Sequence, residues 1–230
     1  MTVVTVRRVD FGYFVRPASE TETGRPQVEP VLGYLIELSE GALLLDTGMG
    51  SHPDVDAYYR PRTSSLHAAL SAAGRTIEDI RWVANCHLHF DHCGGNPMLP
   101  RRPVFTQRIE LETARSLENY TLLDLVDAPG ISYELLDGEA EIMPGVVVIP
   151  TPGHTAGHQS VVVRSRDGTV IVAGQSHDTA TAYARDALGW RASREGHSYD
   201  LTDIPEWIGH LQQFDPARVV FAHDHSVWIP

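Results

Sequence analysis

Short apolar runs, separated by polar segments that contain glycine or proline, recur along the chain and predict several strands. These runs lie at residues 1–14, 31–46, 81–86, 146–149, 161–173 and 219–221. The second run predicts a hairpin that turns near Glu40-Gly41, and the fifth predicts another that turns at Asp167-Gly168. Polar residues 17–30 predict a surface loop between two strands.

Apolar residues at helical spacing predict three helices, at residues 66–73, 107–117 and 201–211. Ser65 offers an N-cap for the first helix, and Gly74 marks its end. We expect the apolar stripe of the third helix to pack on the core. Residues 118–132 and 180–199 have only weak periodicity. Each is either a plain surface loop or a segment that overhangs a cleft and shapes the choice of substrate.

Strands and helices mixed in this order favour an α/β sandwich. The 230 residues, 42% of them hydrophobic, fit one domain over residues 1–230. A formal net charge of −12 argues against nucleic acid or an anionic membrane as a partner and favours a small, largely uncharged molecule. No apolar stretch reaches membrane-spanning length, and residues 1–14 lack the apolar core of a signal peptide. We therefore expect a cytoplasmic location.

The segment at residues 87–92, HLHFDH, places four metal-capable side chains within six residues. Imidazole nitrogen and carboxylate oxygen suit zinc and similar divalent ions. In an extended segment alternate side chains share a face, so His87 and His89 can converge on one ion. Asp91 and His92 lie on the turn that follows and can reach a second ion beside the first.

Two further histidine-containing segments, at residues 151–158 and 221–225, also follow apolar runs that predict buried strands. A side chain just past a strand end faces a cleft while a rigid scaffold holds it. Three strand ends that each deliver histidine therefore predict one shared metal site.

Two cysteines, Cys86 and Cys93, flank the histidine cluster. Their spacing is not that of a Cys-x-x-Cys redox or zinc motif. We expect two small buried residues that pack the loop, rather than metal ligands or a disulfide.

Taken together, these motifs resemble those of the metallo-β-lactamase superfamily and, within it, the N-acyl-homoserine lactonase group. The matching segments are residues 33–37, 44–49, 87–96 (HLHFDHCGGN), 107–112 and 152–160 (PGHTAGHQS). The resemblance implies a four-layer αββα sandwich with the metals at one edge, between the two sheets.

The resemblance also implies two divalent metal ions, with zinc expected. One would be held by His87, His89 and His154, and the other by Asp91, His92 and His223. Such a pair of ions would activate a shared water and polarise a carbonyl group. Asp91 would take part in proton transfer as well as in ligation. We expect Asp46 to fix the second nitrogen of a ligand histidine, and His158 to be a buried, hydrogen-bonded histidine under the site.

The chain departs from the family at one position. The superfamily supplies a bridging aspartate after a strand, and here Gln175 stands at that position. Asp178 then falls where lactonases carry a tyrosine that contacts the substrate. Three alternatives follow. Asp178 reaches back to bridge the ions, which we favour on grounds of charge; Gln175 ligates weakly; or the site holds one ion or a metal other than zinc.

The leading hypothesis is a metal-dependent hydrolase that opens a small lactone of the N-acyl-homoserine lactone kind, with Asp91 and Asp178 as the catalytic candidates. An alternative is hydrolysis of another ester, thioester or lactone on the same scaffold, because Asp178 replaces a residue that touches the substrate. An iron-dependent redox enzyme and a non-catalytic metal-binding protein are more distant alternatives. The sequence does not indicate the oligomeric state.

Overall fold

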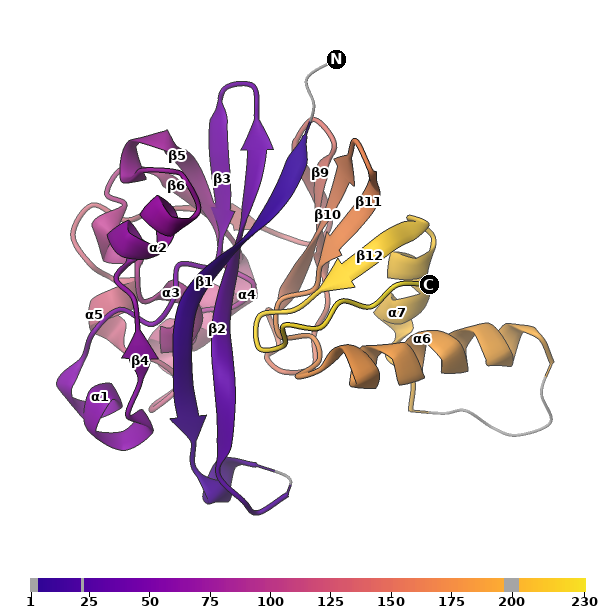
Figure 1. Cartoon of the computed structure of the whole chain (residues 1–230), viewed down its shortest axis with the longest axis horizontal. Coiled ribbons are helices and arrows are strands. Elements are labelled where there is room, and N and C mark those ends of the chain that lie inside the picture. Colours follow the sequence, from indigo (N-terminus) through magenta and orange to yellow (C-terminus); the bar gives the residue numbers. More distant parts are fainter. Residues whose placement is uncertain (1–3, 22, 197–202) are drawn as a thin grey trace.

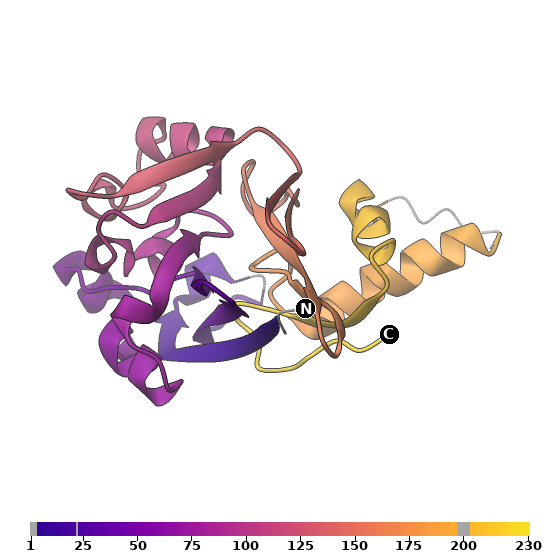
Figure 2. The same ribbon diagram turned by 90° about the horizontal axis from the view of Figure 1, so that it is seen from above.

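Two β-sheets pack face to face, and helices cover the outer face of each (Figure 1). The computed structural model describes residues 4–21, 23–196 and 203–230. The view from above shows α6 and α7 on the side of the second sheet that faces away from the first (Figure 2). The expected αββα sandwich is thus the observed architecture.

The first sheet has seven strands and holds the N-terminal half of the chain. In spatial order they are β4 (Arg62–Thr63), β1 (Thr5–Arg16), β2 (Gln27–Leu38), β3 (Gly41–Leu45), β5 (Ile80–Ala84), β6 (Pro103–Gln107) and β7 (Ser132–Leu136). The second sheet has five strands. They are β12 (Pro216–Val220), β11 (Gly168–Val172), β10 (Gln159–Ser165), β9 (Val146–Pro150) and β8 (Ala140–Met143).

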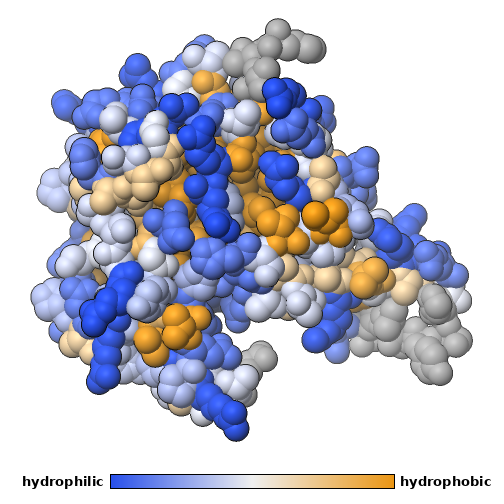
Figure 3. All heavy atoms as spheres, in the orientation of Figure 1, coloured by the Kyte–Doolittle hydropathy of each residue, from blue (hydrophilic) through white to orange (hydrophobic). Residues whose placement is uncertain are grey.

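Seven α-helices connect or cover these strands in the described residues. They are α1 (Pro53–Tyr59), α2 (Leu66–Ala72), α3 (Phe90–Cys93), α4 (Arg108–Ser116), α5 (Leu123–Val126), α6 (Ala180–Arg194) and α7 (Glu206–Gln212). Among these residues, none of the helices is both long and apolar enough to cross a membrane. The face seen in Figure 3 is mostly hydrophilic, with small apolar patches.

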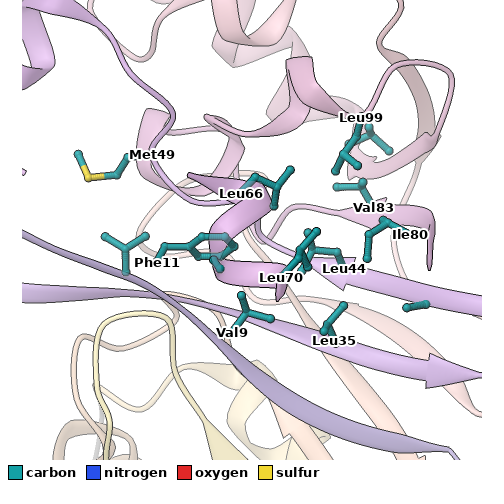
Figure 4. Close-up of a cluster of buried hydrophobic side chains, with 14 of the residues drawn as sticks. Val9, Phe11, Leu35, Leu44, Met49, Leu66, Leu70, Ile80, Val83 and Leu99 are labelled. Carbon is teal, nitrogen blue, oxygen red and sulfur yellow. The ribbon is translucent and has the colours of Figure 1, made fainter. Parts of the chain in front are cut away.

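Three apolar layers hold the four structural layers together. Between the sheets, β2 residues such as Leu32 and Ile36 pack against valines of the second sheet. Outside the first sheet, Leu66 and Leu70 of α2 lie over strand residues such as Leu44 (Figure 4). A third cluster joins the second sheet to α6 and α7. Burial of this kind contributes about 25 cal/mol per Å² of apolar surface, so each layer is a major source of stability.

Both predicted hairpins are present. β2 and β3 pair through Leu38 and Gly41, and β10 and β11 pair through Ser165 and Gly168. The first predicted helix is α2, and its Ser65 side chain accepts a hydrogen bond from the backbone N–H of Ala68. The predicted helix at 107–117 is α4.

Two expectations need correction. Residues 180–194, for which weak periodicity suggested either a surface loop or a segment over the cleft, form the helix α6. Only three of its residues are buried, and two of these are alanines, so the apolar face is too narrow to give a clear helical period. The predicted helix at 201–211 begins only at Glu206, so Ile204 precedes it, and Leu201 lies outside the described residues. Tyr199, the last residue of the 180–199 segment, also lies outside them. Residues 118–131 form a loop around the short helix α5, and Ser132 begins β7.

The two cysteines are buried and unpaired, as expected. Burial raises the pKa of each thiol to about 12. We therefore predict that neither Cys86 nor Cys93 reacts with a disulfide reagent while the chain is folded, because a thiolate in contact with solvent is the reactive form. Reaction of both thiols only after guanidinium unfolding, followed by absorbance, is the expected result. Prompt reaction of one thiol in the native protein would contradict it.

Candidate metal centre

Four loops at one edge of the sandwich bring the metal-capable side chains together. The loop after β5 contains His87 and His89, and the short helix α3 that follows it contains Asp91 and His92. Loops that follow strands of the second sheet supply the others. They are His154 after β9, Gln175 after β11 and His223 after β12.

The first group joins His87, His89 and His154. His87 Nε2 lies 2.9 Å from His89 Nδ1, which lies 3.2 Å from His154 Nε2. Burial lowers the pKa of His89 to about 4 and that of His154 to about 3, and it holds the pKa of His87 well below its ordinary value. Near pH 7 all three rings are therefore neutral and can offer a lone pair.

The second group joins Asp91, His92 and His223. The Nε2 atoms of His92 and His223 are 3.1 Å apart, and Asp91 Oδ2 lies 3.3 Å from each. Burial disfavours the charged Asp91 carboxylate, but the two rings outweigh burial and hold its pKa well below its usual range. Burial also disfavours charge on His92, yet Cys86, Asp91 and Asp46 together raise its pKa well above the ordinary value. The surroundings of this ring thus favour positive charge.

The two groups adjoin each other, since the His87 and His92 ring centroids are 4.0 Å apart. Zinc binds imidazole nitrogen at about 2.0 Å, so tetrahedral ligand atoms lie about 3.3 Å from one another. Neighbouring donor atoms in both groups have close to this spacing. The residues present therefore fit divalent metal ions in donor type and in geometry.

A cleft of about 1000 Å³ opens over both groups. One wall is aromatic, where the Tyr59 ring packs 5.6 Å from Phe14 and 5.0 Å from Phe90, measured between centroids. Tyr120 also lines the cleft, and its ring centroid lies 4.5 Å from that of His89. Tyr120 belongs to the 118–132 segment, which therefore takes the second of the two roles considered for it, a segment at the cleft. Phe14 and Tyr59 were not expected, because β1 and α1 meet only in the folded chain.

Comparison with known families decides the classification. The model of the metallo-beta-lactamase superfamily matches residues 26–223. The chain belongs to this superfamily. The family suspected from the motifs is thereby confirmed.

Relatives within the superfamily agree on one kind of enzyme. The chain is 34% identical over 157 residues to an N-acyl homoserine lactonase of Bacillus sp, a match that covers 62% of each protein. It is 27% identical over 174 residues to the N-acyl homoserine lactonase AttM of Azorhizobium caulinodans, covering 70% of this chain and 64% of that one. The match thus spans under two thirds of these relatives' length.

A solved structure covers more of the chain. It is an N-acyl homoserine lactone hydrolase with the product N-hexanoyl-L-homoserine bound at its catalytic metal centre. The TM-score is 0.76 at 25% identity, over 98% of this chain and 95% of that one.

The structure does not bring Asp178 into either group, contrary to our expectation for the bridging position of the superfamily. The Asp178 side chain is 62% exposed and lies 3.9 Å from Arg16. Gln175 is buried instead, with Oε1 3.2 Å from His92 Nε2. The backbone explains the difference. After the left-handed turn at Gly174, the Gln175 N–H donates to His158 Nε2 and so aims residue 175 inward.

Supporting residues take the places expected of them. Asp46 Oδ2 lies 3.0 Å from His92 Nδ1, and Asp46 Oδ1 accepts the backbone N–H of Cys86. His158 is fully buried, with Nδ1 2.8 Å from Thr151 Oγ1. Both residues therefore orient the site. Asp46 fixes the His92 ring, and His158 holds the Gln175 backbone.

Glu110 is a further support, and sequence reasoning assigned it no role. Its side chain is fully buried in the first turn of α4. It accepts hydrogen bonds from the Leu88 backbone N–H and the Thr155 hydroxyl, each at 2.8 Å, and from the Tyr120 hydroxyl. One carboxyl group thus ties together the loop of His87 and His89, the loop of His154 and the cleft wall.

Proposed function

We propose that this protein is a metal-dependent hydrolase that opens a small lactone of the N-acyl homoserine lactone kind. The observation that carries the proposal is the pair of adjoining donor groups on the floor of a cleft of about 1000 Å³. The likeness to an N-acyl homoserine lactone hydrolase over 98% of the chain supports it.

In this proposal two divalent ions, zinc by preference, occupy the two groups. His87, His89 and His154 hold one, while Asp91, His92 and His223 hold the other. Imidazole and carboxylate donors suit zinc. The low pKa values of the first group and the preference for positive charge in the second both favour bound cations.

When bound, such ions supply an acidified water and polarise the lactone carbonyl. The protein's own groups do the rest. Asp91 lines the cleft and can take the proton that the attacking water gives up, then return it to the ring oxygen as the ester bond breaks. The aromatic wall of Phe14, Tyr59 and Phe90 offers an apolar surface to an acyl group and excludes water from it.

The test is mass spectrometry of a lactone panel incubated with protein loaded with zinc, manganese or cobalt. The panel would contain homoserine lactones of several acyl lengths and simple γ- and δ-lactones. A metal-dependent gain of one water is expected. If esters or thioesters were cleaved while every lactone stayed intact, the alternative hydrolase would replace this proposal.

We predict that Asp46→Asn weakens metal binding by about 10- to 100-fold, the usual cost of losing a partner behind a ligand histidine. Asp46 has φ 59°, a conformation that asparagine also adopts, so the backbone should tolerate the change. Competition with a chromophoric chelator measures the effect. Asp124→Asn, at an exposed position, is the matched control. Equal affinities in the two variants would contradict an orienting role for Asp46.

A further inference from the structure

We propose that Gln175 is itself a metal ligand, through its side-chain oxygen, and that Asp178 is the positioning residue that turns this oxygen toward the metal. The inference rests on the proposed metal centre of the preceding section. It assigns roles to the two positions at which this chain departs from its superfamily.

The orientation of the Gln175 amide follows from its neighbour. Gln175 Nε2 donates a hydrogen bond to Asp178 Oδ1 over 3.3 Å. The reversed amide would set its oxygen against the carboxylate, two acceptors with no proton between them. Asp178 therefore selects the orientation in which Gln175 Oε1 points at the second donor group, 3.2 Å from His92 Nε2.

Acceptors surround His92 Nε2. His223 Nδ1 donates to the Pro30 carbonyl oxygen at 2.8 Å, so the neutral tautomer of this ring has its lone pair on Nε2. Asp91 Oδ2 and Gln175 Oε1 carry no proton. A proton on His92 Nε2 can serve only one of these three neighbours, whereas a divalent cation satisfies all of them at once. With Gln175 the second group becomes a set of four donors, the usual number for zinc.

Asp178 is exposed, and an ion pair holds it in place. Its Oδ2 lies 3.9 Å from Arg16 Nη1, while Arg16 Nη2 lies 3.0 Å from the buried Glu29 carboxylate. Arg16 ends β1 and Glu29 lies in β2, the long pair of strands that extends past the rest of the first sheet (Figure 1). Arg16 thus connects Asp178 to this pair of strands, and Asp178 in turn orients the side-chain amide of Gln175.

A neutral ligand has a measurable consequence. Gln175 contributes no negative charge, so the repulsion between two neighbouring dications is less compensated than it would be with a carboxylate. Gln175→Glu, made together with Asp178→Asn so that two carboxylates do not face each other, should therefore tighten binding of the second ion by about tenfold or more. The apolar Gln175→Leu should weaken it to a similar degree.

The experiment is a titration of the metal-free protein with Zn²⁺ against a competing chelator, with metal content measured by mass spectrometry. We expect the affinity for the second ion to fall in the order Gln175→Glu with Asp178→Asn, wild type, Gln175→Leu. Asp178→Ala should weaken it several-fold, whereas Asp178→Asn, which keeps an acceptor oxygen, should stay near wild type. The visible spectrum of the Co²⁺-loaded protein should change in Gln175→Leu, because an oxygen donor is lost. The exposed Gln213→Leu is the matched control.

Wild-type affinity for two ions in Gln175→Leu would overturn the assignment of Gln175 as a ligand. An unchanged affinity in Asp178→Ala, beside a weakened Gln175→Leu, would overturn the positioning role. If Gln175→Leu failed to fold, Gln175→Asn would replace it, since the shorter side chain withdraws the oxygen and should also weaken the second site. No substrate enters these measurements. Normal metal loading without lactone turnover would therefore count against the proposed function alone.

Discussion

Replacing His89 by alanine is expected to lower kcat/KM for lactone opening by roughly 1000-fold or more, about 4 kcal/mol of transition-state stabilisation. His89 Nδ1 stands between the other two donors of the first group, 2.9 Å from His87 Nε2 and 3.2 Å from His154 Nε2. Alanine removes this donor and leaves two imidazoles, too few to hold an ion in fixed geometry.

Steady-state kinetics with a homoserine lactone, together with metal content per chain, would check this expectation. His67→Ala is the matched control, because His67 is an exposed histidine on α2. Full activity in His89→Ala at unchanged metal content would contradict the proposed role of the first group.

The histidine motifs could be predicted from the sequence because their information is local. Strand β5, the histidine-rich segment and a turn with glycine follow one another within residues 80–96, so neighbours in sequence are neighbours in space. The same holds for the two hairpins, whose turn residues sit between the strands that they join.

The placement of Gln175 and Asp178 shows a limit of such reasoning, since Gln175 is buried and Asp178 is exposed. An argument from charge favoured Asp178, because two cations call for carboxylates. The chain path overrides that preference. The left-handed turn at Gly174 and the hydrogen bond from the Gln175 N–H to His158 aim residue 175 inward. Asp178 follows three residues later, exposed and just before α6 begins at Ala180.

The cleft wall shows a second limit. Phe14, Tyr59 and Tyr120 come from a strand, a short helix and a loop far apart in sequence. Weak periodicity allowed a place at the cleft for the segment that contains Tyr120, but it did not single out this residue. Phe14 and Tyr59 look like ordinary apolar or surface residues within their own segments, since no short-range pattern marks a side chain that meets its partners only through tertiary packing. Arg16 is similar, because its neighbours Glu29 and Asp178 are apparent only in the folded chain.

Glu110 is the position at which we expect the largest loss of stability. Glu110→Ala should lower the free energy of unfolding by about 3–5 kcal/mol, because it leaves the Leu88 N–H, the Thr155 hydroxyl and the Tyr120 hydroxyl without their shared acceptor. Chemical denaturation of the metal-free protein isolates this effect from metal binding.

Two further substitutions sharpen the comparison. Glu110→Gln keeps the size of the side chain and one acceptor oxygen, so it should cost less, about 1–3 kcal/mol. Glu112→Ala removes an exposed carboxyl group two residues along the same helix and should change stability by under about 0.5 kcal/mol. The expected order of destabilisation is therefore Glu110→Ala, Glu110→Gln, Glu112→Ala. If Glu110→Ala were no less stable than Glu112→Ala, the three hydrogen bonds would not be what holds the two histidine loops together.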